Sequence, residues 1–89
     1  MKYTIIFEER ASKELSRIDK PGRLLVLKKI KQLGEDPDSL SNNIKILKGK
    51  YDHFRLRIGR FRVIFNKDDK KITITIIRVG LRSKIYNSI

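Results

Sequence analysis

The strongest structural signal in this chain lies at residues 54–65, which read FRLRIGRFRVIF. Apolar and basic side chains alternate on both sides of a glycine, a pattern typical of two strands that each have one buried face and one polar face. A two-residue turn at Gly59 and Arg60 pairs Ile58 with Phe61 and keeps the same parity to the ends of both strands. The pattern therefore predicts a β-hairpin with one wholly apolar face.

The opposite face of this hairpin carries arginines. The same register places Arg57 directly opposite Arg62, with Arg55 two residues along on that face. Like charges that face each other across a ladder cost about 0.2–1 kcal/mol, so stability alone does not explain the arrangement. Guanidinium groups are always protonated and bind phosphate oxygens through paired hydrogen bonds. We interpret the three arginines as a phosphate clamp, with a solvated sheet face as the alternative.

The segment before the hairpin predicts one strand and two helices. Apolar alternation indicates a strand over residues 2–8, and helical spacing indicates one helix from Glu9 and another over residues 21–34. The polar run at residues 36–43 predicts a connection. We expect an α+β fold in the order β-α-α-β-β-β, in which a two-helix hairpin packs on a curved, mainly antiparallel sheet.

The segment after the hairpin predicts a third strand of the same meander. A turn around Asp68 brings Phe65 opposite Ile72 and preserves the apolar parity across three strands. The last strand is expected to end at Val79. A short helical turn that contains Tyr86 follows it.

The composition excludes several classes of protein. The chain has 89 residues, which suits a single domain over residues 1–89. With no cysteine and one histidine, we expect no disulfide framework, metal site or cofactor. The longest apolar stretch, residues 24–27, is far shorter than a membrane span, and the N-terminus lacks the apolar core of a signal peptide. We therefore expect a cytoplasmic protein with no membrane partner and no small-molecule cofactor.

The charge of the chain is unevenly placed. The formal net charge is +12, of which residues 1–43 contribute +2 and residues 44–89 contribute +10. This distribution favours a polyanionic partner bound by the second half. It disfavours a helix-turn-helix protein that binds DNA, because the helical first half carries only +2. The interpretation of Lys45, Lys48 and Lys50 stays open between contacts to a nucleic-acid backbone and ordinary solvated side chains.

Two motifs resemble a known family. They are LKGKYDHFRLRIGRFRVIF at residues 47–65 and IIRVGLRSKIY at residues 76–86, in the expected order along nearly the whole chain. Both are similar to toxins of the RelE/ParE superfamily of type II toxin–antitoxin systems. The resemblance to the RelE branch implies a ribosome-dependent interferase that cleaves messenger RNA in the A site. The ParE branch shares the fold and poisons DNA gyrase, and a cognate antitoxin neutralises both.

The resemblance also implies roles for individual residues. By their place in the RelE pattern, Arg57 and Arg62 stabilise the charged phosphate, and Arg55 contacts RNA. Arg82 serves the leaving-group side, and Tyr86 stacks on a base. Without the resemblance, the sequence favours a surface arginine and a tyrosine that covers the edge of the core. The implied reaction is attack of a ribose 2′-hydroxyl on the adjacent phosphate, which gives a 2′,3′-cyclic phosphate and a 5′-hydroxyl.

One difference from the family concerns the general base. Family members can carry lysines at the positions of Arg55 and Arg57, and a lysine can lose its proton whereas an arginine cannot. Lys48, Tyr86, His53 or a group of ribosomal RNA could accept the 2′-proton, so the base stays unassigned and the activity could be weak. The alternatives to the interferase are a ParE-like gyrase inhibitor and a non-catalytic RNA-binding module.

Overall fold

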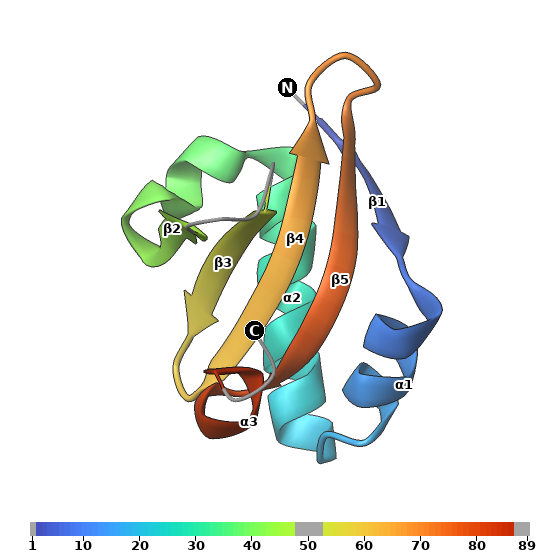
Figure 1. Ribbon diagram of the computed structural model, residues 1–89, viewed down its shortest axis with the longest axis vertical. Helices are drawn as coiled ribbons and strands as arrows, with labels where there is room; N and C mark the ends of the chain where they lie inside the picture. The colour runs from blue at the N-terminus through green and yellow to red at the C-terminus, as the bar shows by residue number, and fades with distance from the viewer. Residues whose placement is uncertain (1, 48–52, 87–89) are drawn as a thin grey trace.

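The chain forms one five-stranded sheet flanked by helices (Figure 1). The computed structural model describes residues 2–47 and 53–86. The elements in chain order are β1 (Thr4–Phe7), α1 (Glu9–Ser16), α2 (Lys20–Glu35), the 3-10 helix η1 (Pro37–Asn43), β2 (Ile44–Ile46), β3 (His53–Ile58), β4 (Phe61–Asp68), β5 (Thr73–Leu81) and α3 (Arg82–Tyr86). The expected α+β class is confirmed.

The sheet is mainly antiparallel, and its spatial order is β1-β5-β4-β3-β2. The three pairs from β2 to β5 are antiparallel, whereas β1 runs parallel to β5. The first and last strands of the chain therefore lie side by side, and the hairpin of β3 and β4 occupies the other half of the sheet.

The predicted hairpin is confirmed in its register. Ile58 lies opposite Phe61 and Phe54 lies opposite Phe65, whose rings stack with centroids 5.4 Å apart. Gly59 has a φ of +56° at the first turn position, a conformation that glycine adopts without the steric cost of a side chain. The tight turn thus fixes which residues face each other across the two strands.

The register predicted between β4 and β5 is wrong, by four residues at Phe65 and by five at Val63 and Phe61. Phe65 lies opposite Ile76 and not opposite Ile72, because β4 continues to Asp68 and the turn occupies residues 69–72. A shift by an even number keeps each side chain on its face of the sheet, so the predicted apolar parity still holds at this pair.

A β-bulge changes the register by one further residue along β5. Ile64 pairs with Arg78 and Phe65 pairs with Ile76, which leaves Ile77 as the extra residue of β5. The bulge allows both Ile76 and Val79 to be buried although they differ in parity.

The predicted order of elements lacked one strand. Residues 44–46 form β2, an edge strand that is antiparallel to β3. Three residues are too short for an alternating pattern to show in the sequence. The preceding polar run, expected to be a plain connection, contains η1.

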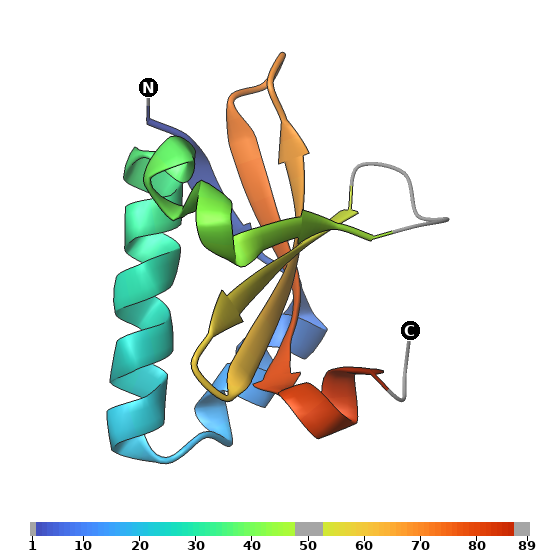
Figure 2. The same ribbon diagram turned by 90° about the vertical axis from the view of Figure 1, so that its left-hand side faces the viewer.

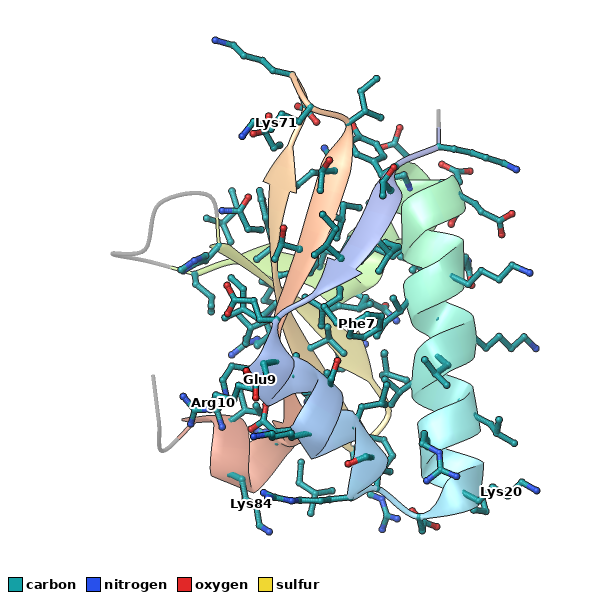
Figure 3. The ribbon with its side chains drawn as sticks, turned by 90° about the vertical axis from the view of Figure 1, so that its right-hand side faces the viewer. Phe7, Glu9, Arg10, Lys20, Lys71 and Lys84 are labelled. Carbon is teal, nitrogen blue, oxygen red and sulfur yellow. The ribbon has the colours of Figure 1, made fainter. Side chains whose placement is uncertain are left out.

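The core lies between the sheet and α2, which covers one face (Figure 2). Val26, Ile30 and Leu33 of α2 are buried at helical spacing against the apolar face of the hairpin. Phe7 points from β1 towards this layer (Figure 3). Within the described residues, no helix is both long and apolar enough to cross a membrane.

The helix α1 protects the edge of β5 beyond the end of β1. Glu14 accepts a hydrogen bond from the backbone N–H of Val79 at 3.0 Å and binds the guanidinium of Arg78, with Nη2 2.8 Å from Oε2. Burial raises the pKa of Glu14, but the hydrogen bonds from Arg78 and Val79 and the charges of Arg78 and Arg10 outweigh it and hold the pKa below its ordinary value. This carboxylate therefore stays ionised and caps an otherwise open strand edge.

Candidate nucleic-acid interface

Residues of η1, β2, β3, β4 and α3 line a basic pocket. Figure 2 shows that α2 and α3 lie on opposite sides of the sheet. The pocket has a volume of about 390 Å³, and seven residues line it: Asn42, Asn43, Lys45, Arg55, Arg57, Arg62 and Arg82. Five of the seven are cationic and none is acidic. A site with this lining selects anions, because each arginine offers several N–H donors and a permanent positive charge.

Strand pairing positions most of these cations. Arg57 lies opposite Arg62, as predicted, and Lys45 of β2 lies opposite Arg55 of β3. Side chains of paired residues point to the same face, so β2, β3 and β4 each contribute to one surface. Groups held on strands keep their relative positions better than groups on loops.

The start of α3 brings in Arg82 from the far end of the chain. The backbone N–H of Arg82 donates to the carbonyl of Arg60 at 3.0 Å, which ties the helix to the tip of the hairpin. Arg82 was expected in a loop after the last strand, and it is instead the first residue of α3. Its side chain lines the same pocket as the strand arginines.

Arg62 is the most unusual member of the pocket, because it is only 6% exposed. Its Nη1 donates to two backbone carbonyls, that of Gly59 at 2.7 Å and that of Phe61 at 2.8 Å. Neither partner carries a charge, and among the described residues no carboxylate forms an ion pair with Arg62. A buried charge without a counter-ion is costly, so an anion bound in the pocket would stabilise this side chain.

The pocket includes two residues that the sequence did not single out. Asn42 and Asn43 come from the end of η1, in the run interpreted as a polar connection. The side chain of Asn43 donates to the backbone carbonyl of Arg57 at 3.5 Å. The pairing of β2 with β3 brings these amides to the arginines, and no local pattern in the sequence indicates that strand.

The other predicted residues lie elsewhere or beyond the description. Lys48 and Lys50 fall outside the described residues, and Tyr86 is the last residue of α3. His53 starts β3 and lines a separate groove with Asn66. The structure therefore brings together Lys45 and the four predicted arginines, and it keeps the histidine apart from them.

The fold is that of a small toxin of the RelE/ParE superfamily. Residues 5–86 match the profile described as the ParE toxin of the type II toxin–antitoxin system parDE. Since the match spans nearly the whole chain, the chain belongs to this family.

Individual relatives are named RelE or RelE-like toxins. The chain is 32% identical to a RelE-like toxin protein of Escherichia coli and 29% identical to the mRNA interferase toxin RelE of Escherichia coli K12; each match covers 98% of this chain and 93% of the relative. The intact RelBE toxin–antitoxin complex of Escherichia coli contains a similar chain, with 30% identity, a TM-score of 0.72, and coverage of 89% of this chain and 95% of that one. The chain is thus a RelE-like toxin of a type II toxin–antitoxin system.

Proposed function

We propose that this toxin is a ribosome-dependent endoribonuclease that cleaves messenger RNA in the A site. The observation that carries the proposal is the pocket that Arg57, Arg62 and Arg82 line together, with no acidic group among the described lining residues. Support also comes from a relative, 29% identical along almost the whole chain, that is named an mRNA interferase.

The proposed reaction begins with attack of a ribose 2′-hydroxyl oxygen on the adjacent phosphorus. A new P–O bond closes the 2′,3′-cyclic phosphate, the P–O5′ bond breaks, and the 5′-oxygen leaves with a proton. Arg57 and Arg62 stabilise the negative charge that gathers on the equatorial oxygens. Arg82 lies on the leaving-group side, and Tyr86 stacks on a base next to the scissile bond.

The pocket is lined by arginines, which cannot remove the 2′-proton. Every cation among its lining residues except Lys45 is an arginine, which holds its proton at all accessible pH values. Of the proton acceptors that the sequence suggested, Lys48, Tyr86 and a ribosomal RNA group remain in our proposal, whereas His53 lines a separate groove. Catalysis depends mainly on charge stabilisation and in-line alignment.

We propose a cognate antitoxin as the regulatory partner. In the Escherichia coli RelBE complex, a chain similar to this one is bound to its antitoxin. The cationic pocket here suits a segment that is net acidic or amphipathic, and that covers the arginine face or displaces the segment carrying Tyr86. Neutralisation by a segment that leaves both regions open would contradict this proposal.

A second candidate function is inhibition of DNA gyrase. The family profile that matches this chain is described as a ParE toxin, and that branch shares the fold. Expression of a gyrase inhibitor would induce the SOS response and trap gyrase on DNA while messenger RNA stays intact. A non-catalytic RNA-binding module would produce neither effect and would cut nothing.

Brief induction followed by primer extension on translated messenger RNA tests the proposal. We expect growth and translation to stop, with cuts positioned by codon. Arg57→Ala and Arg82→Ala should each reduce the cuts on the order of 100-fold. Arg10→Ala removes the same charge from the exposed surface of α1 (Figure 3) and should leave them unchanged. Full cleavage by both pocket variants would contradict the assignment of these arginines.

A further inference from the structure

We propose that Asn43 is a specificity-determining residue that lets the pocket prefer RNA to DNA, by accepting a hydrogen bond from a ribose 2′-hydroxyl. This inference deepens the proposed function and rests on its assignment of the pocket to a nucleic acid. The inference is based on the position of the Asn43 amide, which lies at the end of η1 beside the arginines of β3 and β4.

The first step is an inventory of the hydrogen-bonding groups around the pocket. The five cations donate hydrogen bonds and accept none through their charged groups. The amides of Asn42 and Asn43 supply the only side-chain acceptors among the seven lining residues. Phosphate oxygens are acceptors and are satisfied by the cations, whereas a ribose 2′-hydroxyl also donates and needs an acceptor.

The second step concerns the orientation of Asn43. Its Nδ2 lies 3.5 Å from the backbone carbonyl of Arg57, which can only accept a hydrogen bond. The amino group of Asn43 therefore donates to β3, and the amide oxygen points away from the carbonyl of Arg57. Register also places Asn43 next to Arg57: Ile44 pairs with Leu56, so the preceding residue of the chain faces Arg57.

The third step is the difference between the two asparagines. Asn42 is exposed and has no hydrogen bond among the described side chains, whereas Asn43 is half-buried and tied to β3. An acceptor held in place loses less conformational freedom when it binds a ligand. Asn43 is therefore the residue of the pair that can read a single hydroxyl group.

The chemistry of this recognition separates RNA from DNA. A deoxyribose has no 2′-hydroxyl, and a 2′-fluoro group cannot donate a hydrogen bond. One neutral hydrogen bond contributes enough for about a two- to tenfold difference in affinity. Contacts to phosphate do not distinguish the two polymers, so the arginines supply the affinity and Asn43 supplies the preference.

Binding of purified protein to short single strands tests the inference without requiring cleavage. The probes are an RNA, the DNA of equivalent sequence and the 2′-fluoro RNA, measured at one salt concentration. We expect the wild type to bind RNA about two- to tenfold more tightly than either analogue. Asn43→Ala should bring this ratio close to one while the affinity for DNA changes less than twofold.

Two further variants separate a specific role from a structural one. Asn43→Asp adds a negative charge and removes the amino group that donates to the carbonyl of Arg57, so it should weaken binding of RNA and DNA alike. Asn66→Ala makes the same truncation in the separate groove beside His53 and should change neither affinity nor ratio. The test depends on the ratio of affinities, which a general loss of structure would not shift selectively.

The result that overturns the inference is a wild-type RNA-to-DNA ratio that Asn43→Ala leaves unchanged, or the absence of any preference in the wild type. Such a result can coexist with codon-positioned cleavage, in which case the proposed function stands and the role of Asn43 fails. Conversely, a protein that never cleaves messenger RNA but loses its RNA preference in Asn43→Ala supports the inference and contradicts the nuclease proposal.

Discussion

The Arg57–Arg62 pair shows how single residues of the pocket can oppose the stability of the fold. The two like charges face each other across β3 and β4. Their surroundings differ, because Arg57 is exposed whereas Arg62 is 6% exposed and donates to the carbonyls of Gly59 and Phe61. Removing one or the other should therefore affect stability in different ways.

We predict that Arg57→Ala separates activity from stability. Loss of the repulsion should leave the free energy of unfolding unchanged or raise it by up to about 1 kcal/mol. Cleavage should fall on the order of 100-fold, as when a preorganised charge at a reaction centre is lost. Arg62→Ala should instead lower the unfolding free energy by about 1–3 kcal/mol, since two carbonyls lose their donor. Urea unfolding checks both values, and equal destabilisation by the two variants would contradict this account.

A second prediction concerns pH and Glu14. Folding lowers the pKa of this carboxyl through Arg78 and Val79, against the opposing effect of burial. Its contribution to stability is therefore complete above the ordinary glutamate pKa of about 4.3 and is lost as the pH falls through the lower pKa of the folded state.

Glu14→Gln should accordingly destabilise the protein at neutral pH, and the difference from the wild type should shrink as the solution is acidified. Urea unfolding across that pH range measures the difference. Glu9→Gln is the control, because Glu9 is an exposed residue paired with Lys13 3.1 Å away (Figure 3), and such pairs contribute little. A pH-independent deficit in Glu14→Gln would show that its role is not electrostatic.

At the scale of elements, the turn between β4 and β5 carries backbone strain. Ile72 has a φ of +51°, a left-handed conformation that is unfavourable for a β-branched residue. Ile72→Asn should raise the unfolding free energy by about 1 kcal/mol, because asparagine tolerates this conformation. Thermal unfolding tests it. RNA cleavage should be unchanged, since Ile72 does not line the pocket, and a loss of stability would argue against strain at this turn.

The contact between α2 and β4 depends on a glycine. A Cβ added at Gly22 would lie 2.7 Å from Cζ of Phe61 and 2.9 Å from Cγ2 of Ile18. An alanine usually stabilises a helix relative to glycine, but here we expect Gly22→Ala to cost about 1–3 kcal/mol because the buried ring must move. Denaturant unfolding gives the sign of the effect. A stabilised variant would mean that α2 packs less closely on the hairpin.

The elements differ in how well the sequence predicts them. The hairpin register followed from alternation around Gly59, because a two-residue turn permits one pairing. The next register failed because Asp68, a typical turn residue, belongs to β4, and the turn ends at an isoleucine. β2 and the bulge at Ile77 arise from pairing with strands distant in the sequence, which no local pattern reveals.

The residues of the candidate site also differ in how well the sequence predicts them. The arginines of β3 and β4 were predictable from local alternation, whereas Arg82 joins them through the family resemblance and Asn43 through the pairing of β2. Polar residues in a connection resemble ordinary turn residues. Tertiary structure alone shows that some of them reach the pocket.

In the whole molecule, the positive charge is concentrated in the part of the chain that supplies the cations of the pocket. The second half of the chain carries +10 of the net +12, and its strands β2, β3 and β4 together with α3 supply the five cations of the basic pocket. The first half supplies α2, which covers the opposite face and part of the core. In our proposal, the bulk charge attracts a polyanion, and the pocket concentrates that attraction on one phosphate.

The most direct measurement of the central claim uses purified protein, ribosomes programmed with a defined messenger RNA, and mapping of both fragment ends. The account predicts cleavage within the A-site codon only when ribosomes are present, a 2′,3′-cyclic phosphate on the upstream fragment and a 5′-hydroxyl on the downstream one. Intact messenger RNA on those ribosomes, together with inhibition of DNA gyrase by the same preparation, would contradict it.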